Sequence, residues 1–224
     1  MALQRRSRID RHLTAQPGLK EAAAIAFGGK FYLSVGGRCY VADSRQKYRD
    51  DAAGTSYEWY YWDNIPACCF LEWENRLYFG TADGRLCRFC LPQETGAYLD
   101  DGDAIDAWWK TPMLHFGSHT VYKNIRNVAV TAMPYARSGM SVYYSSDEEW
   151  MRLVYQGNID LFSWENLDFS RFSFRSIPAP FARFTGERSR HITVFQVTVR
   201  NAQPDEPFGL LGLQIDYTIG GGVR

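Results

Sequence analysis

Two stretches of the chain show the same order of apolar, polar and turn residues. The sequence GKFYLSVGGRCYVAD covers residues 29–43, and NRLYFGTADGRLCRF covers residues 75–89. In each stretch, alternating apolar residues lead into a short Gly-containing segment and then a second apolar run. Gly-Gly and Asp-Gly favour tight hairpin turns because these residues adopt positive φ at little cost. The pattern therefore predicts two β-hairpins of matched geometry.

The spacing of the two hairpins resembles that of β-propeller blades. Tyr32 and Tyr78 occupy the same place in the two stretches, about 46 residues apart, and blades repeat every ~40–50 residues. A closed propeller needs at least about four blades, so further blades would come from another chain, or the region would stay open. The aromatic stretch 57–70 would supply outer blade strands or, alternatively, a platform for sugars. Residues 19–27, LKEAAAIAF, have helix propensity, but their place just before a hairpin favours an inner strand over 23–27.

Residues 91–106, LPQETGAYLDDGDAID, are typical of a linker or exposed loop. They divide the chain into a propeller-like hairpin region, 1–95, and a second domain, 96–224. Short apolar runs with turn residues between them fill this second domain and predict an antiparallel, jelly-roll-like β-sandwich. They are AIDAWWKT, NIRNVAVTAM, MSVYYSS, MRLVYQ, RFSFRSI, HITVFQVTV and LLGLQIDYTI. The predicted fold class is all-β throughout.

The last of these runs predicts a central strand over 213–219. Its apolar residues share one face, which we expect to be buried, and Gln214, Asp216 and Thr218 share the other face. The apolar residues are Leu213, Ile215, Tyr217 and Ile219.

Composition narrows the range of partners. Lys and Arg balance Asp and Glu at 25 each, so the chain lacks the positive field that holds proteins on nucleic acids or anionic membranes. No apolar run approaches the ~20 residues of a membrane helix, and no apolar segment follows the basic N-terminal residues, so we expect neither a signal peptide nor a membrane span. Aromatic residues make up 16% of the chain, which favours sheets over helices.

The thiols and carboxylates predict neither a metal site nor a cofactor. CRFC at 87–90 has the spacing of half a zinc site, but no His lies between His12 and His115, so we expect free thiols that are buried and structural. The acidic run 100–103 could hold Ca²⁺, but it lacks the Glu-terminated loop of a calcium hand and is predicted to be a solvated turn. The five cysteines are Cys39, Cys68, Cys69, Cys87 and Cys90.

The same reasoning favours a protein that is not an enzyme. Asp103 and Asp106, or the acids at 147–149, could supply the two carboxylates of a glycosidase. Neither set has the apolar surroundings that would raise one pKa. The chain also lacks a Gly-x-Ser-x-Gly elbow, a His-Glu-x-x-His motif and a Gly-rich phosphate loop.

Three further stretches have a recognisable pattern of positions: DGDAIDAWWKTPMLHFG, NIRNVAVTA and the ending FQVTVRNAQPDEPFGLLGLQIDYTIGGGVR. With them, the chain from about residue 29 onward resembles tail and tail-connector proteins of bacteriophages and prophages. In that family, hairpins of the LYFGTADGRL type lead into a β-sandwich that closes with an apolar strand. The resemblance implies a virion protein that is assembled in the bacterial host cytoplasm, with copies of itself and other virion proteins as partners.

Such a protein would act by assembly into a ring, and exposed aromatic side chains would anchor its interfaces. The candidate interface residues are Trp108, Trp109, Tyr122 and Trp150. Each could instead belong to the sandwich core. An alternative function is a carbohydrate-binding module of a tail tip, in which the same aromatic residues would stack on host-surface glycans.

Overall fold

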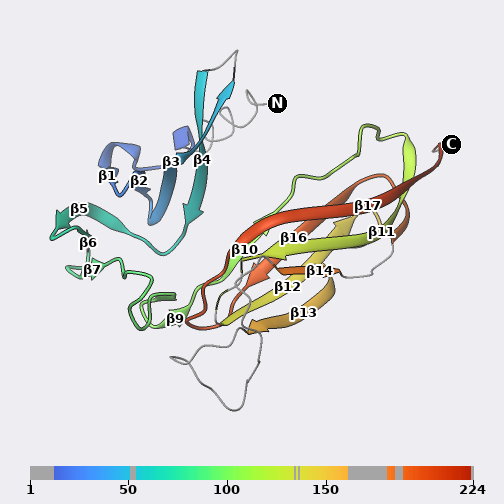
Figure 1. Ribbon diagram of the computed structural model, residues 1–224. Helices are drawn as coiled ribbons and strands as arrows, with labels where there is room; N and C mark the ends of the chain where they lie inside the picture. The colour runs from blue at the N-terminus through green and yellow to red at the C-terminus, as the bar shows by residue number, and fades with distance from the viewer. Residues whose placement is uncertain are drawn as a thin grey trace. The chain divides into compact units, whose positions relative to one another are not determined.

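The computed structural model describes residues 13–50, 54–133, 135, 137–160, 181–184 and 189–222 (Figure 1). Its secondary structure confirms the predicted all-β fold class, with antiparallel strands throughout the described sheets. The chain divides into two compact units, residues 1–91 and 92–224. Within the described ranges, no helix has the length and apolar character needed to cross a membrane.

The first sheet of unit 1 is a four-stranded meander in the order β1-β2-β3-β4. Its strands are β1 (Ala23–Phe27), β2 (Lys30–Val35), β3 (Arg38–Asp50) and β4 (Gly54–Trp62). The second sheet has the order β5-β6-β7, with β5 (Ala67–Trp73), β6 (Arg76–Thr81) and β7 (Leu86–Arg88). The predicted hairpins are confirmed as β2–β3 and β6–β7, and the strand expected at 23–27 is β1.

The repeated segment in the two sheets is longer than the sequence pattern indicated. A two-residue turn joins β1 to β2 at Gly28 and Gly29, and another joins β5 to β6 at Glu74 and Asn75. All four residues have positive φ, between 48° and 76°, as expected for the turn type that matches strand twist in hairpins. The repeat therefore begins one strand before the hairpins, and the aromatic stretch 57–70 is divided between β4 and β5.

An aromatic-rich core lies between the two sheets of unit 1. Tyr32, Cys39 and Val41 of the first sheet are buried against Leu77 of the second. The Tyr32 ring lies 5.9 Å from the Phe89 ring, measured between centroids. At the rim of this core, the buried Asp43 carboxylate accepts hydrogen bonds from Arg45, which lower the pKa of Asp43 to about 2.

Unit 2 contains two larger antiparallel sheets and a small hairpin formed by β8 (Leu99–Asp100) and β9 (Asp103–Ala104). One sheet has the order β10-β16-β12-β13. In the other, β11 pairs with β14 and β15, and also with β17. The strands of the two sheets are β10 (Ala107–Lys110), β11 (Val121–Ala132), β12 (Arg137–Ser146), β13 (Arg152–Asp160), β14 (Phe181–Phe184), β15 (Ser189–Ile192), β16 (Phe195–Asn201) and β17 (Leu210–Gly222).

The two sheets face each other across a mainly aliphatic core and so form a sandwich. Alternate residues of β16 point inward because side chains change face at every position along a strand, and Val197 and Val199 are fully buried. They pack with Val130 of β11 and Val142 of β12. The expected RFSFRSI strand, residues 171–177, lies outside the described residues.

Within the sheets that the structure describes, 213–219 does not pair centrally as predicted. Among the described strands, β17 pairs only with β11, and Figure 1 shows the two running side by side. The expected buried face is only partly buried: Leu213 and Ile215 pack on the core, but Tyr217 is exposed and Ile219 is 68% exposed. Alternation along a strand identifies its two faces, but the sandwich core does not extend to the end of β17.

Candidate assembly surfaces

Trp108 and Trp109, two predicted interface residues, lie on the edge strand β10. Trp108 is opposite Arg200 in the pairing with β16, and Trp109 is opposite Val199. Because Val199 is fully buried in the core, Trp109 is on the core side of the sheet and Trp108 on its outer side. Both indoles are nevertheless exposed, since β10 has a described neighbour on one side only.

Charged groups surround Trp108 on this outer face. The Lys110 ammonium lies 4.6 Å from the centroid of the Trp108 ring, a cation–π distance. The Arg200 guanidinium donates two hydrogen bonds to the Asp106 carboxylate, at 2.6 and 2.9 Å, and this carboxylate raises the pKa of Arg200. The pairing of strands aligns Trp108, Arg200, Ser141 and Gln156 in one row across the sheet.

Tyr122 and Trp150 lie on other elements. Tyr122, on β11, is half-buried, and its ring meets the His191 ring edge-on at 5.7 Å. Trp150 is exposed in the connection between β12 and β13. The preceding Glu149 accepts hydrogen bonds from Tyr144 and from Arg152, which together lower the pKa of Glu149. Trp150 is therefore presented by a hydrogen-bonded loop, whereas Tyr122 already packs within the unit.

A further exposed apolar surface lies on the second sheet of unit 1, and the sequence analysis missed it. Leu71, Trp73 and Leu86 are 53%, 61% and 72% exposed. Leu71 lies opposite Tyr78, and Tyr78 lies two residues from Gly80, which is opposite Leu86. These side chains share the face of the sheet that points away from Leu77 and Phe79. The sequence signal that could have revealed them is the repeat itself, extended by one strand toward the N-terminus.

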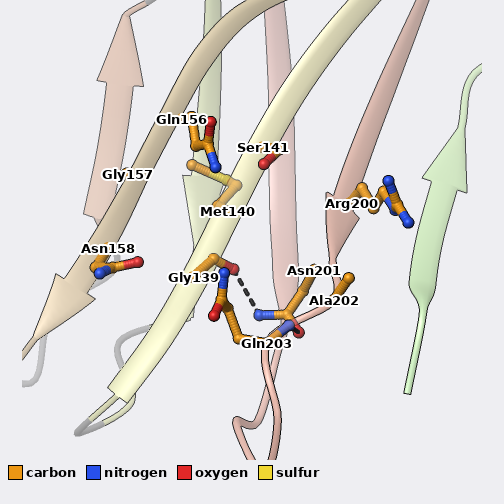
Figure 2. A pocket seen from close by; sticks show the side chains of 10 residues that line it. All are labelled: Gly139, Met140, Ser141, Gln156, Gly157, Asn158, Arg200, Asn201, Ala202 and Gln203. Atoms are coloured by element: carbon orange, nitrogen blue, oxygen red, sulfur yellow. Dashed lines mark hydrogen bonds between the residues drawn. The ribbon is translucent and has the colours of Figure 1, made fainter. Parts of the chain in front are cut away.

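The polar pocket in Figure 2 is a small structural feature of the sandwich. It lies at one end of β12, β13 and β16 and has a volume of about 30 Å³, which is room for a water or two. Asn201 donates a hydrogen bond to the carbonyl of Gly139 at 2.7 Å, and the Gly139 amide donates to Glu206 at 2.6 Å. Small-molecule sites are typically tenfold larger, and both of these hydrogen bonds fix the backbone of Gly139.

Three of the acids considered for catalysis, Asp106, Asp147 and Glu149, have structural partners. Asp106 is engaged by Arg200, and Asp147 accepts hydrogen bonds from the amide and the hydroxyl of Thr193. The run 100–103 forms the turn between β8 and β9, with positive φ at Asp101 and Gly102.

None of the five cysteines forms a disulfide, and burial raises the pKa of the Cys39 thiol to about 11. The expectation that these thiols are buried is wrong for Cys87 and Cys90, because Cys87 is only half-buried and Cys90 is exposed beyond the end of β7. In the described part of the chain, no group of three or more His, Cys, Asp or Glu residues could hold a metal ion.

No protein-family model matches the chain, and no curated protein is significantly similar to it in sequence.

Proposed function

We propose that this chain is a structural protein of a phage-like particle, located in the tail or at the head–tail connection, and that it acts by assembly into a ring. The observation that carries the proposal is the exposure of large apolar side chains on paired strands of both units. Trp73 lies on β5 and Trp108 on β10. Exposed apolar clusters mark interaction surfaces, and Trp is enriched among the residues that dominate binding energy.

The resemblance to tail and tail-connector proteins supports this proposal. Its C-terminal part, LLGLQIDYTIGGG, corresponds to the edge strand β17. An edge strand leaves backbone donors and acceptors open to a partner strand, so β17 offers a second route to contact between virion proteins.

The proposal is tested on particles. Virions purified from a culture of the host on a density gradient are digested and analysed by mass spectrometry. Peptides of this chain should copurify with the particle band in a fixed ratio to the other virion proteins. Peptides that occur in the lysate but not in the particle band would contradict the proposal.

A second candidate function, glycan binding, is favoured by the row of Trp108, Arg200, Ser141 and Gln156. An exposed indole beside hydrogen-bonding side chains can stack on a sugar ring and bind its hydroxyl groups. A glycan array probed with the full chain tests this function. Binding that is lost in Trp108→Ala and kept in the control Trp73→Ala would support it, and an assembly subunit should give no hits.

A further inference from the structure

Residues of the first sheet of unit 1 can be matched one by one with residues of the second sheet. Ile25, Phe27 and Tyr32 of the first sheet correspond to Leu71, Trp73 and Tyr78 of the second, since the turns at Gly28-Gly29 and Glu74-Asn75 coincide. In the next strand, Cys39 corresponds to Leu86, because Cys39 is paired with Ser34 and Leu86 with Gly80, its equivalent. Each of these positions is apolar or aromatic in both sheets.

These equivalent positions have opposite environments. In the first sheet, Tyr32 and Cys39 are buried, and Ile25 and Phe27 pack against the same core. In the second sheet, Leu71, Trp73 and Leu86 are more than half exposed. The face that the first sheet buries is therefore the face that the second sheet leaves open.

The two sheets contact each other through non-equivalent sides: the side that the second sheet uses is the opposite of the side that the first sheet uses. The second sheet contributes Leu77, Phe79 and Phe89 to it. Their equivalents in the first sheet are Phe31, Leu33 and Ala42, which lie on the side of that sheet away from the core. The two sheets consequently pack head to tail, which means that one side of the repeat contacts the opposite side of the next repeat.

A head-to-tail contact leaves one face at each end of unit 1 outside this contact. On the second sheet this is the outer face formed by Leu71, Trp73, Tyr78 and Leu86. On the first sheet it is the outer face of β1 and β2 around Phe31 and Leu33, of which Phe31 is exposed, whereas Val35, Tyr40 and Ala42 on the same side are buried. These two outer faces occupy the same strand positions as the two faces that already bind each other within unit 1.

We propose that the outer face of the second sheet binds the outer face of the first sheet in a second copy of this chain. This inference rests on the proposed function, because it names the surface and the partner through which assembly occurs. A second copy fits because Phe31 and Leu33 stand where Leu77 and Phe79 stand in the existing contact. Repeated between copies, a head-to-tail contact closes into a ring when its rotation permits.

Two charge substitutions test the proposal on the full chain. Trp73→Glu blocks one outer face and Phe31→Glu blocks the other, and each should raise the dissociation constant of self-association at least ~30-fold in sedimentation experiments. When the two variants are mixed in equal amounts, they should form a one-to-one dimer, because each retains the face that the other lacks. A two-fold symmetric contact would not be restored in this way.

Controls separate loss of the contact from loss of the fold. Thermal melts and circular dichroism identify variants that unfold, and Leu86→Glu replaces Trp73→Glu if the latter is unstable. Leu153→Glu, at an exposed position of β13 in unit 2, should leave self-association through unit 1 unchanged.

Three outcomes would overturn the inference. One is self-association of Trp73→Glu and Phe31→Glu at the strength of the unmodified chain. Another is failure of the two folded variants to combine on mixing. The third is loss of assembly in Leu153→Glu but not in Trp73→Glu. In this third case, or if the unmodified chain is monomeric yet present in particles, the proposed function stands while the inference fails.

Discussion

The two units of this protein bury their apolar residues in different ways. In unit 2, residues of β11, β12 and β16 point toward each other from two sheets and enclose a core of Val, Ile and Phe side chains. In unit 1, the buried set is smaller, and tilted aromatic rings surround it. Apolar residues also lie on the outer faces of both its sheets. Unit 2 thus completes its own core, whereas unit 1 has the open-ended packing of a repeat that gains stability from neighbours.

The core of unit 2 should show the largest response to truncation. Phe195 is fully buried and its ring stacks on that of Tyr144 at 5.3 Å. Phe195→Ala should lower the free energy of unfolding of unit 2 by about 3–5 kcal/mol. Hydrogen exchange of peptides from β11 and β12 measures this change, with peptides from β2 and β3 as the internal reference. A loss below ~1 kcal/mol would mean that the sandwich core is not closed around Phe195.

Truncation in unit 1 should have a smaller and local effect. Leu77 is buried between the two sheets, and Leu77→Ala should cost about 2–3 kcal/mol, because the surrounding rings can partly fill the cavity. Hydrogen exchange should rise in β2, β3 and β6 and stay unchanged in β12 and β16. An equal rise in both units would contradict the separation of their cores.

The two faces of β17 in unit 2 should differ in their sensitivity to truncation. Ile215 is half-buried against the core, whereas Gln214 is exposed and donates a hydrogen bond to Asp216. Ile215→Ala should cost about 1–2 kcal/mol, less than a fully buried Ile, and Gln214→Ala no more than ~0.5 kcal/mol. Denaturant melts of the two variants measure the difference. A larger loss for Gln214→Ala would show that the two faces of β17 are assigned the wrong way round.

A small gain in stability is expected at the turn that the two sheets of unit 1 share. Glu74 has φ of 48°, a conformation that Gly adopts at its equivalent, Gly28. Glu74→Gly should therefore stabilise unit 1 by about 0.5–1 kcal/mol, because relief of left-handed strain exceeds the added entropy of the unfolded chain. Glu74→Ala keeps the strain and serves as the control. A melting temperature lower for Glu74→Gly than for Glu74→Ala would contradict this account of the turn.

Local sequence patterns predicted where the strands lie better than they predicted which strands pair with each other. Gly36-Gly37 and Asp83-Gly84 identified two hairpins because their preference for positive φ is local. The turn at Glu74-Asn75 was missed, since Glu rarely adopts positive φ and only the matching Gly28-Gly29 reveals it. The position of β17 beside a single described strand, β11, was also missed, because alternation along a strand gives no information about which strands lie beside it.

Sequence pattern was also insufficient to predict which candidate interface residues are exposed. The exposed Trp108, Trp109 and Trp150 were identified by residue type, but Tyr122 packs on His191. Trp73 and Leu86 resemble their buried equivalents Phe27 and Cys39 in character, so sequence pattern alone predicts core for both sets. Only the three-dimensional packing of the two sheets shows which set is covered.

The most direct test of head-to-tail assembly is a cryo-electron microscopy reconstruction of the oligomer that the full chain forms. We expect β5, β6 and β7 of one copy to pack against the outer face of β1–β4 in the next copy, with Trp73 buried at the contact. A reconstruction in which neighbouring copies touch only through unit 2, with Trp73 facing solvent, would contradict the account.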